Sequence, residues 1–159
     1  MRHPRAIDGV QFSRNGSQVR GTLGCEHLPR LAELGCRVLA ASFELQGATS
    51  STDKPCLRLQ AAAQVELVCQ RCLEPLQMHL AAEAELELCE SGLEIARAQD
   101  DVDRVLACPA MDVAQLVEDE LILALPDTPK HERCALSLGG EAAGRASAFE
   151  PLSRLRHGQ

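Results

Sequence analysis

Two long runs of alternating apolar and polar residues flank a Cys-x-x-Cys motif, and they restrict the fold more than any other feature of the sequence. The runs at 56–69 (CLRLQAAAQVELVC) and 76–90 (LQMHLAAEAELELCE) place apolar side chains at every second position. Because successive side chains of a β-strand point to opposite faces, this period predicts antiparallel strands with one face on a core and the other, including Glu87, in water. The residues between the runs, QRCLEP, predict a hairpin connection that carries the CxxC at its tip.

A third alternating run and two helical segments complete the predicted fold. The run at 36–46 predicts another strand, and 28–34 (LPRLAEL) predicts a short N-terminal helix. The segment 112–125 (DVAQLVEDELILAL) has apolar residues at helical spacing and predicts the main helix. We therefore expect an α+β fold, in which an antiparallel β-sheet with a long hairpin is covered by the main helix and the short N-terminal helix.

The ends and faces of the main helix follow from individual residues. Asp112 is expected to cap the first turn, with Gln115 as its capping-box partner, and Pro126 stops the helix. The apolar stripe leaves Glu118 and Asp119 facing solvent.

The sequence predicts a single domain followed by a tail. Residues 1–135 form the predicted α+β domain, and 136–159 form a flexible linker followed by a basic and apolar tail. Within the domain, 47–55 is an expected loop and 91–104 an expected mobile acidic connection.

Charge and cysteine content restrict the location and the partners. The start of the chain has no apolar run behind its basic residues, and no segment is apolar enough to span a membrane, so we expect a cytoplasmic protein whose eight cysteines stay reduced. Residues 81–120 carry 2 basic and 12 acidic side chains, a net charge of −10 within a total of −7. This block disfavours general RNA binding and suits a basic protein partner, although a solvated acidic face explains it equally well.

Three interpretations of the CxxC remain open. Cys69 and Cys72 can form a structural zinc site with His131 and Cys134 of PKHERC, which would join the hairpin tip to the segment after the main helix. The pair can instead be a compact turn of packed, reduced thiols, or a redox dithiol, although the redox form usually requires a helix N-terminus beside it. Arg71 between the cysteines is a candidate contact for phosphate or carboxylate.

No catalytic motif emerges from the sequence. There is no G-x-S-x-G, no H-E-x-x-H and no glycine-rich phosphate loop followed by lysine. We therefore expect neither an enzyme nor a protein with a small-molecule substrate.

Two segments together resemble the bacterial YceD family, the large ribosomal RNA subunit accumulation proteins. They are VELVCQRCLEPL and MDVAQLVEDELILALPDTPKH, and they match a family pattern of C-x-R-C at a strand end and an Asp-initiated helix that ends at proline. The matching positions are Cys69, Arg71, Cys72, Asp112, Leu116, Val117, Glu118, Asp119, Glu120, Leu121, Leu123, Leu125 and Pro126. Some relatives have further cysteines after the helix, where this chain has only His131 and Cys134.

The resemblance implies a role in the synthesis, processing or stability of 23S ribosomal RNA and a basic protein partner. The leading hypothesis is a non-enzymatic ribosome-biogenesis factor that binds large-subunit precursor RNA, or a basic ribosomal protein or assembly factor. Its expected contact surfaces are Arg71 and the acidic helix residues Glu118, Asp119 and Glu120. The alternatives are a zinc- or thiol-dependent enzyme, such as a nuclease or oxidoreductase, and a chaperone for a basic large-subunit ribosomal protein.

Overall fold

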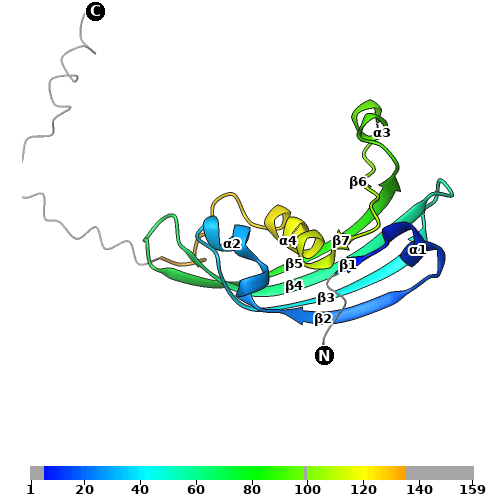
Figure 1. The fold of residues 1–159 in the computed structure, drawn as a ribbon. Coiled ribbons are helices and arrows are strands. Elements are labelled where there is room, and N and C mark those ends of the chain that lie inside the picture. Colours follow the sequence, from blue (N-terminus) through cyan, green and yellow to red (C-terminus); the bar gives the residue numbers. More distant parts are fainter. Residues whose placement is uncertain (1–5, 99, 135–159) are drawn as a thin grey trace, which may run out of the picture.

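The computed structural model describes residues 6–98 and 100–134, and its centre is a five-stranded sheet (Figure 1). The strand order is β2-β3-β4-β5-β6, and every neighbouring pair is antiparallel except β5 and β6, which are parallel. The sheet strands are β2 (Gln18–Leu23), β3 (Arg37–Thr49), β4 (Pro55–Val68), β5 (Pro75–Cys89) and β6 (Arg104–Leu106). The other elements are β1 (Ala6–Ile7), α1 (Gly9–Arg14), the 3₁₀ turn η1 (Cys25–His27), α2 (Pro29–Glu33), α3 (Gly92–Arg97), β7 (Met111–Asp112) and α4 (Val113–Leu123).

The long hairpin predicted from the alternation is confirmed. Its strands β4 and β5 pair in one unbroken register from Cys56 opposite Glu87 to Val68 opposite Pro75. Strand β3 also matches its prediction but continues to Thr49, so the expected loop at 47–55 is shorter than its sequence indicated. The chain is therefore an α+β protein built around this hairpin.

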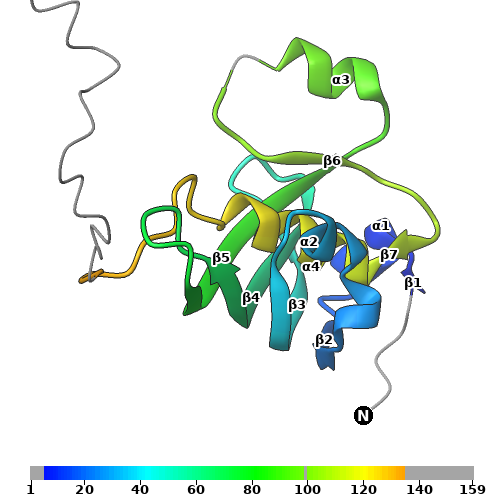
Figure 2. The same ribbon diagram turned by 90° about the vertical axis from the view of Figure 1, so that its left-hand side faces the viewer.

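One face of the sheet is covered by helices, as the period-two pattern predicted. Helices α2 and α4 lie over the same face (Figures 1 and 2). The inward residues of β3 and β4 form the core beneath them, and Leu45, Leu57 and Val65 have no exposed surface. Burying an aliphatic side chain of this size contributes about 2 kcal/mol, so this layer is the main source of stability. Polar residues of the opposite face, such as Arg58 and Gln60, are exposed.

Helix α4 begins at Val113, directly after Asp112, the N-cap predicted from the sequence. The Asp112 carboxylate accepts hydrogen bonds from the backbone N–H groups of Ala114 (2.8 Å) and Gln115 (3.3 Å), which have no partner inside the helix. Among the described residues, no helix is long and apolar enough to cross a membrane.

Several short elements were not predicted from the sequence. Strand β2 is only six residues long and contains Gly21, and helix α1 is six residues long and capped by Asp8. The prediction of a mobile connection at 91–104 is wrong for Gly92–Arg97, which form α3 with Ser91 as N-cap. Elements this short carry too few periods for a sequence pattern to reveal them.

Two carboxylates predicted to face water are buried instead. Glu87 is 2 % exposed because the β3–β4 turn and Arg104 of β6 enclose the end of β5. Glu118 is 3 % exposed because the N-terminus of α2 lies against it. The segments that bury these two carboxylates are distant from them in sequence. Helical or strand periodicity alone therefore predicts, incorrectly, that both side chains are exposed.

Candidate metal centre

The hairpin tip is a tight turn that folds the CxxC back on itself. The backbone N–H of Cys69 donates to the carbonyl of Glu74 (2.9 Å), and the N–H of Leu73 donates to the carbonyl of Cys69 (2.9 Å). Leu73 has a φ of 63°, a left-handed conformation that is costly for a leucine and permits the reversal. Cys69 and Cys72 are thereby placed on one side of the turn.

The segment after α4 lies against this turn. The N–H of Gln70 donates to the carbonyl of Pro129 (2.8 Å), and the N–H of His131 donates to the Cys69 sulfur (3.5 Å). These contacts bring His131 and Cys134 to cysteines that lie about sixty positions earlier in the chain. The structure thus brings together all four residues of the predicted metal site.

The spacing of the four donor atoms fits a single tetrahedral ion. All four atoms lie within 4.8 Å of one another. The two sulfurs of Cys69 and Cys134 are 3.5 Å apart, and Nδ1 of His131 lies 3.3 Å from the Cys72 sulfur and 3.8 Å from the Cys134 sulfur. A tetrahedral zinc ion with ordinary bond lengths separates two sulfurs by roughly 3.8 Å and a sulfur from a nitrogen by roughly 3.6 Å.

The imidazole of His131 is oriented as a metal ligand. Its Nε2 lies 3.1 Å from the carbonyl oxygen of Pro75, so Nε2 carries the proton and donates it to that oxygen. The tautomer leaves Nδ1, the atom that faces the sulfurs, with a free lone pair. A backbone carbonyl that fixes the second ring nitrogen is the usual support of a metal-bound histidine.

The thiols differ in how readily they ionise. Burial raises the pKa of Cys69, but backbone N–H groups of Cys72, His131 and Arg71 lower it more, to about 5. The N–H of Glu74 lowers the pKa of Cys72, yet burial and the neighbouring sulfurs leave it above its usual value. Three thiolates in such proximity repel one another, so full ionisation of the set requires a cation.

Arg71 folds back over the cluster instead of projecting from the tip. Its guanidinium donates to the carbonyl of His131 (2.9 Å) and interacts with the Cys134 thiol. Burial raises the pKa of Cys134, but the contact with Arg71 contributes to a net lowering. A site of three thiolates and one neutral imidazole around a divalent cation has a net charge of −1, which this guanidinium offsets.

The acidic residues singled out on the main helix lie outside the metal centre. The Glu118 carboxylate accepts from the backbone N–H groups of Arg30 (2.7 Å) and Leu31 (3.1 Å), at the start of α2, and from Nε of Arg30 (3.1 Å). Asp119 pairs with the same guanidinium. Asp112 is the cap of α4, and Glu120 is half-buried. Glu118 therefore fastens α2 to α4 and is not available as a contact surface.

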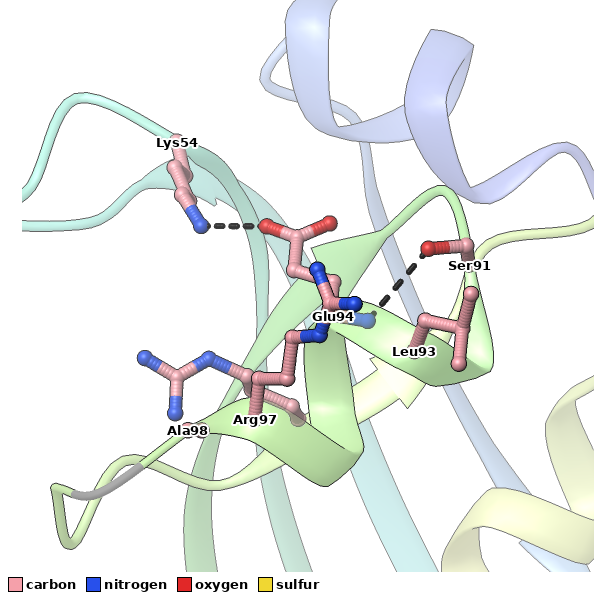
Figure 3. Close-up of a pocket in the computed structure, with 7 residues that line it drawn as sticks. Lys54, Ser91, Leu93, Glu94, Arg97 and Ala98 are labelled. Carbon is pink, nitrogen blue, oxygen red and sulfur yellow. Dashed lines mark hydrogen bonds and ion pairs between the residues drawn. The ribbon is translucent and has the colours of Figure 1, made fainter.

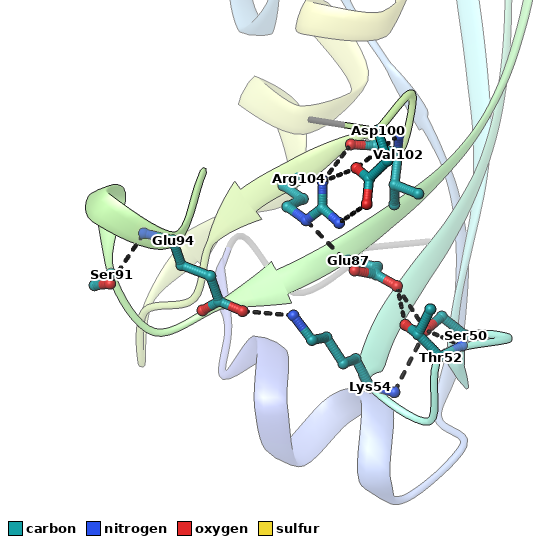
Figure 4. A network of polar contacts seen from close by, with 9 residues as sticks. All are labelled: Ser50, Thr52, Lys54, Glu87, Ser91, Glu94, Asp100, Val102 and Arg104. Carbon is teal, nitrogen blue, oxygen red and sulfur yellow. Dashed lines mark hydrogen bonds and ion pairs between the residues drawn. The ribbon is translucent and has the colours of Figure 1, made fainter. Parts of the chain in front are cut away.

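A second polar cluster, which sequence reasoning missed, closes the opposite end of the hairpin (Figure 4). Glu87 accepts hydrogen bonds from the hydroxyls of Ser50 (2.8 Å) and Thr52, and Nε of Arg104 lies 3.5 Å from its other oxygen. The hydroxyls of Thr52 and Ser50 lower the pKa of Glu87, and the charges of Arg104 and Lys54 add to this effect against burial. Arg104 also binds Asp100, which holds the pKa of that carboxyl at about 2.

A pocket of about 510 Å³ adjoins this cluster (Figure 3). Lys54 and Glu94 form an ion pair across it, and Ser91 caps α3 at its rim. The pocket lies at the junction between α3 and the sheet.

Comparisons with known proteins agree with the residue pattern of the hairpin tip and the main helix. A family model described as "Large ribosomal RNA subunit accumulation protein YceD" matches residues 57–151. The chain is also similar to the Large ribosomal RNA subunit accumulation protein YceD of Haemophilus influenzae, with 28 % identity over 96 % of this chain and 95 % of the relative. No solved structure matches. The metal cluster, the capped helix α4 and most of the long hairpin all lie within the matched residues, and the chain belongs to the YceD family.

Proposed function

We propose that this chain is a non-enzymatic ribosome-biogenesis factor of the cytoplasm, acting in the synthesis, processing or stability of 23S ribosomal RNA. The observation that carries the proposal is its similarity to a large ribosomal RNA subunit accumulation protein, which extends over nearly the whole of both chains. The factor acts by binding large-subunit precursor RNA or an associated basic protein. It acts as one domain over 1–135, and the proposed linker and tail at 136–159 lie outside the described residues.

We also propose that Cys69, Cys72, His131 and Cys134 hold one zinc ion with a structural role. Two features support zinc: the three sulfurs and one imidazole are the donors it prefers, and their spacing suits its tetrahedral geometry. The ion would join the tip of the long hairpin to the segment after α4. It would supply cross-linking and no chemistry, because four protein donors leave no open position for a substrate.

The donor geometry also weighs against a thiol-dependent enzyme. Of the two cysteines with a lowered pKa, Cys69 has the larger shift and no exposed surface, and Cys134 is half-buried with its sulfur against Arg71 and the other donors. A catalytic or redox thiolate must be reached by its substrate. The low pKa is therefore better explained as preparation of a metal ligand by backbone N–H groups.

The proposal is tested in a deletion strain of the source organism. We expect the ratio of mature large-subunit to small-subunit ribosomal RNA to fall, and to recover when the wild-type chain is supplied. A Cys25→Ser chain should restore the ratio as well, because Cys25 is exposed and outside the cluster. An unchanged ratio in the deletion strain would disprove the proposed function.

A further inference from the structure

One long edge of the sheet is left without a neighbouring strand. Strand β5 pairs with β4 from Pro75 to Glu87, but β6 pairs with it only from Glu87 to Cys89. On its other side, the stretch from Pro75 to Leu86 adjoins no strand of the described residues. Unpaired edges of this length are sites where another chain can add a strand, and most proteins cover or interrupt them.

The hydrogen bonds to β6 show which residues present their backbone to this edge. The N–H of Glu87 donates to the carbonyl of Asp103 (2.9 Å), and the N–H of Ala107 donates to the carbonyl of Cys89 (2.8 Å). Backbone groups alternate sides along a strand, so every second residue before Glu87 also points to the free edge. These residues are Gln77, His79, Ala81, Glu83 and Glu85.

The free edge is exposed, and its backbone N–H and C=O groups have no hydrogen-bond partner in the described part of the chain. The side chains of all five residues are exposed, and no hydrogen bond within the described part of the chain reaches their backbone groups. On the helix-covered face beside the edge, Met78, Ala82 and Ala84 are only half-buried. An added strand would satisfy the backbone groups and cover this apolar row.

The acidic residues near the free edge favour an added strand that carries basic side chains. Glu83, Asp103 and Glu120 have no cationic partner among residues 6–98 and 100–134. Burial raises the pKa of Glu120, and the charges of Asp103 and Asp119 raise it further, as expected for acidic groups that lack a counter-charge. An edge of this charge repels phosphate and attracts lysine or arginine.

We propose that the β5 edge from Gln77 to Glu85 is a docking site for an extended basic segment of a partner protein, which adds to the sheet as a further strand. The inference rests on the proposed function and selects, from its two kinds of partner, a basic protein over RNA. Backbone hydrogen bonds would provide the affinity, and the carboxylates would provide the preference for basic residues.

The test uses the full-length protein and a synthetic peptide of alternating lysine and valine. A peptide of about 11 residues spans the edge at the usual rise of a β-strand. Amide hydrogen exchange followed by NMR should show slowing of at least tenfold at Gln77, His79, Ala81, Glu83 and Glu85. The amides between them should change little, because they already pair with β4. A peptide N-methylated at every residue keeps the charge, loses all of its backbone donors and should not bind.

Protein variants separate backbone pairing from charge. Ala81→Pro removes one edge N–H and should weaken binding at least tenfold, whereas Ala81→Val keeps it and should not. Glu83→Lys should weaken binding by about threefold, and Glu33→Lys, the same charge change on exposed α2, should not. Circular dichroism verifies that each variant is folded.

Three results would overturn the inference. The first is equal binding to folded Ala81→Pro, or protection at β2 instead of β5. The second is slow exchange at the five amides before peptide is added, which would mean that this chain already covers its own edge. The third is the same protection by a uridine oligonucleotide. If the inference fails while deletion still lowers the large-subunit RNA ratio, the proposed function stands without this docking site.

Discussion

The two ends of the long hairpin are closed in different ways. At the tip, three thiols and an imidazole from two distant segments converge, and among residues 6–98 and 100–134 the cationic side chain that contacts them is Arg71. At the base, Glu87 is already bound by two hydroxyls and an arginine. The charge of Glu87 is thus matched by groups that the chain itself supplies, although its second oxygen accepts no hydrogen bond among the described residues, whereas the tip consists of donors that repel one another when ionised. If, as we propose, a zinc ion completes the tip, only the tip should respond to removal of metal.

The largest expected effect is loss of metal at the tip. Cys69→Ser should reduce bound zinc from about one per chain to none, as measured by atomic emission on the purified protein. Loss of an ion present at a thousandfold above its Kd lowers the free energy of unfolding by about 4 kcal/mol, measured by urea denaturation. Cys25→Ser is the matched control and should keep the metal. Stoichiometric zinc in Cys69→Ser, or no zinc in the wild type, would remove the distinction between the two ends.

An intermediate effect is expected at the base. Glu87→Gln weakens charge-assisted hydrogen bonds from Ser50 and Thr52 and should lower the free energy of unfolding by about 2 kcal/mol, without changing metal content. Glu85→Gln, the exposed neighbour two positions away on β5, is the control. If Glu87→Gln also released zinc, the two ends would not be independent.

The base should also have its own acid dependence. The pKa of Glu87 is lowered in the folded state, chiefly by the hydroxyls of Thr52 and Ser50. Its contribution to stability is therefore present above its unfolded pKa and is lost as the pH falls through the lowered folded value. Urea denaturation should show that the free energy of unfolding of the wild type exceeds that of Glu87→Gln by a constant amount near neutral pH. This excess should become smaller in acid. A difference in unfolding free energy that grows in acid would contradict a lowered pKa of Glu87 in the folded state.

The smallest effect separates two roles for Arg71. Arg71→Gln removes the guanidinium that binds the carbonyl of His131 and contacts Cys134. We expect zinc affinity to fall by about tenfold in competition with a chelator, the usual result of losing such a supporting contact. Arg133→Gln changes a nearby exposed arginine and should not alter affinity. Unchanged metal affinity together with weaker RNA binding would instead make Arg71 a contact residue, as the sequence alone indicated.

The sequence by itself determined the hairpin, the cap of α4 and the four residues of the candidate metal centre. Strand alternation is a local property that repeats over many residues, and the Asp112 cap acts within one helical turn. The pairing of the CxxC with His131 and Cys134 was accessible because few other residues of the chain are suitable ligands at similar spacing.

Only the tertiary structure decided which polar residues are buried and what they bind. The Glu118 side chain caps a helix that lies 88 positions earlier in the chain, and Glu87 meets a turn 37 positions earlier. The open edge of β5 likewise depends on how far β6 extends along it. Periodicity reports which face of an element a residue occupies, whereas burial of a charge depends on the hydrogen-bond partner that another segment brings to it.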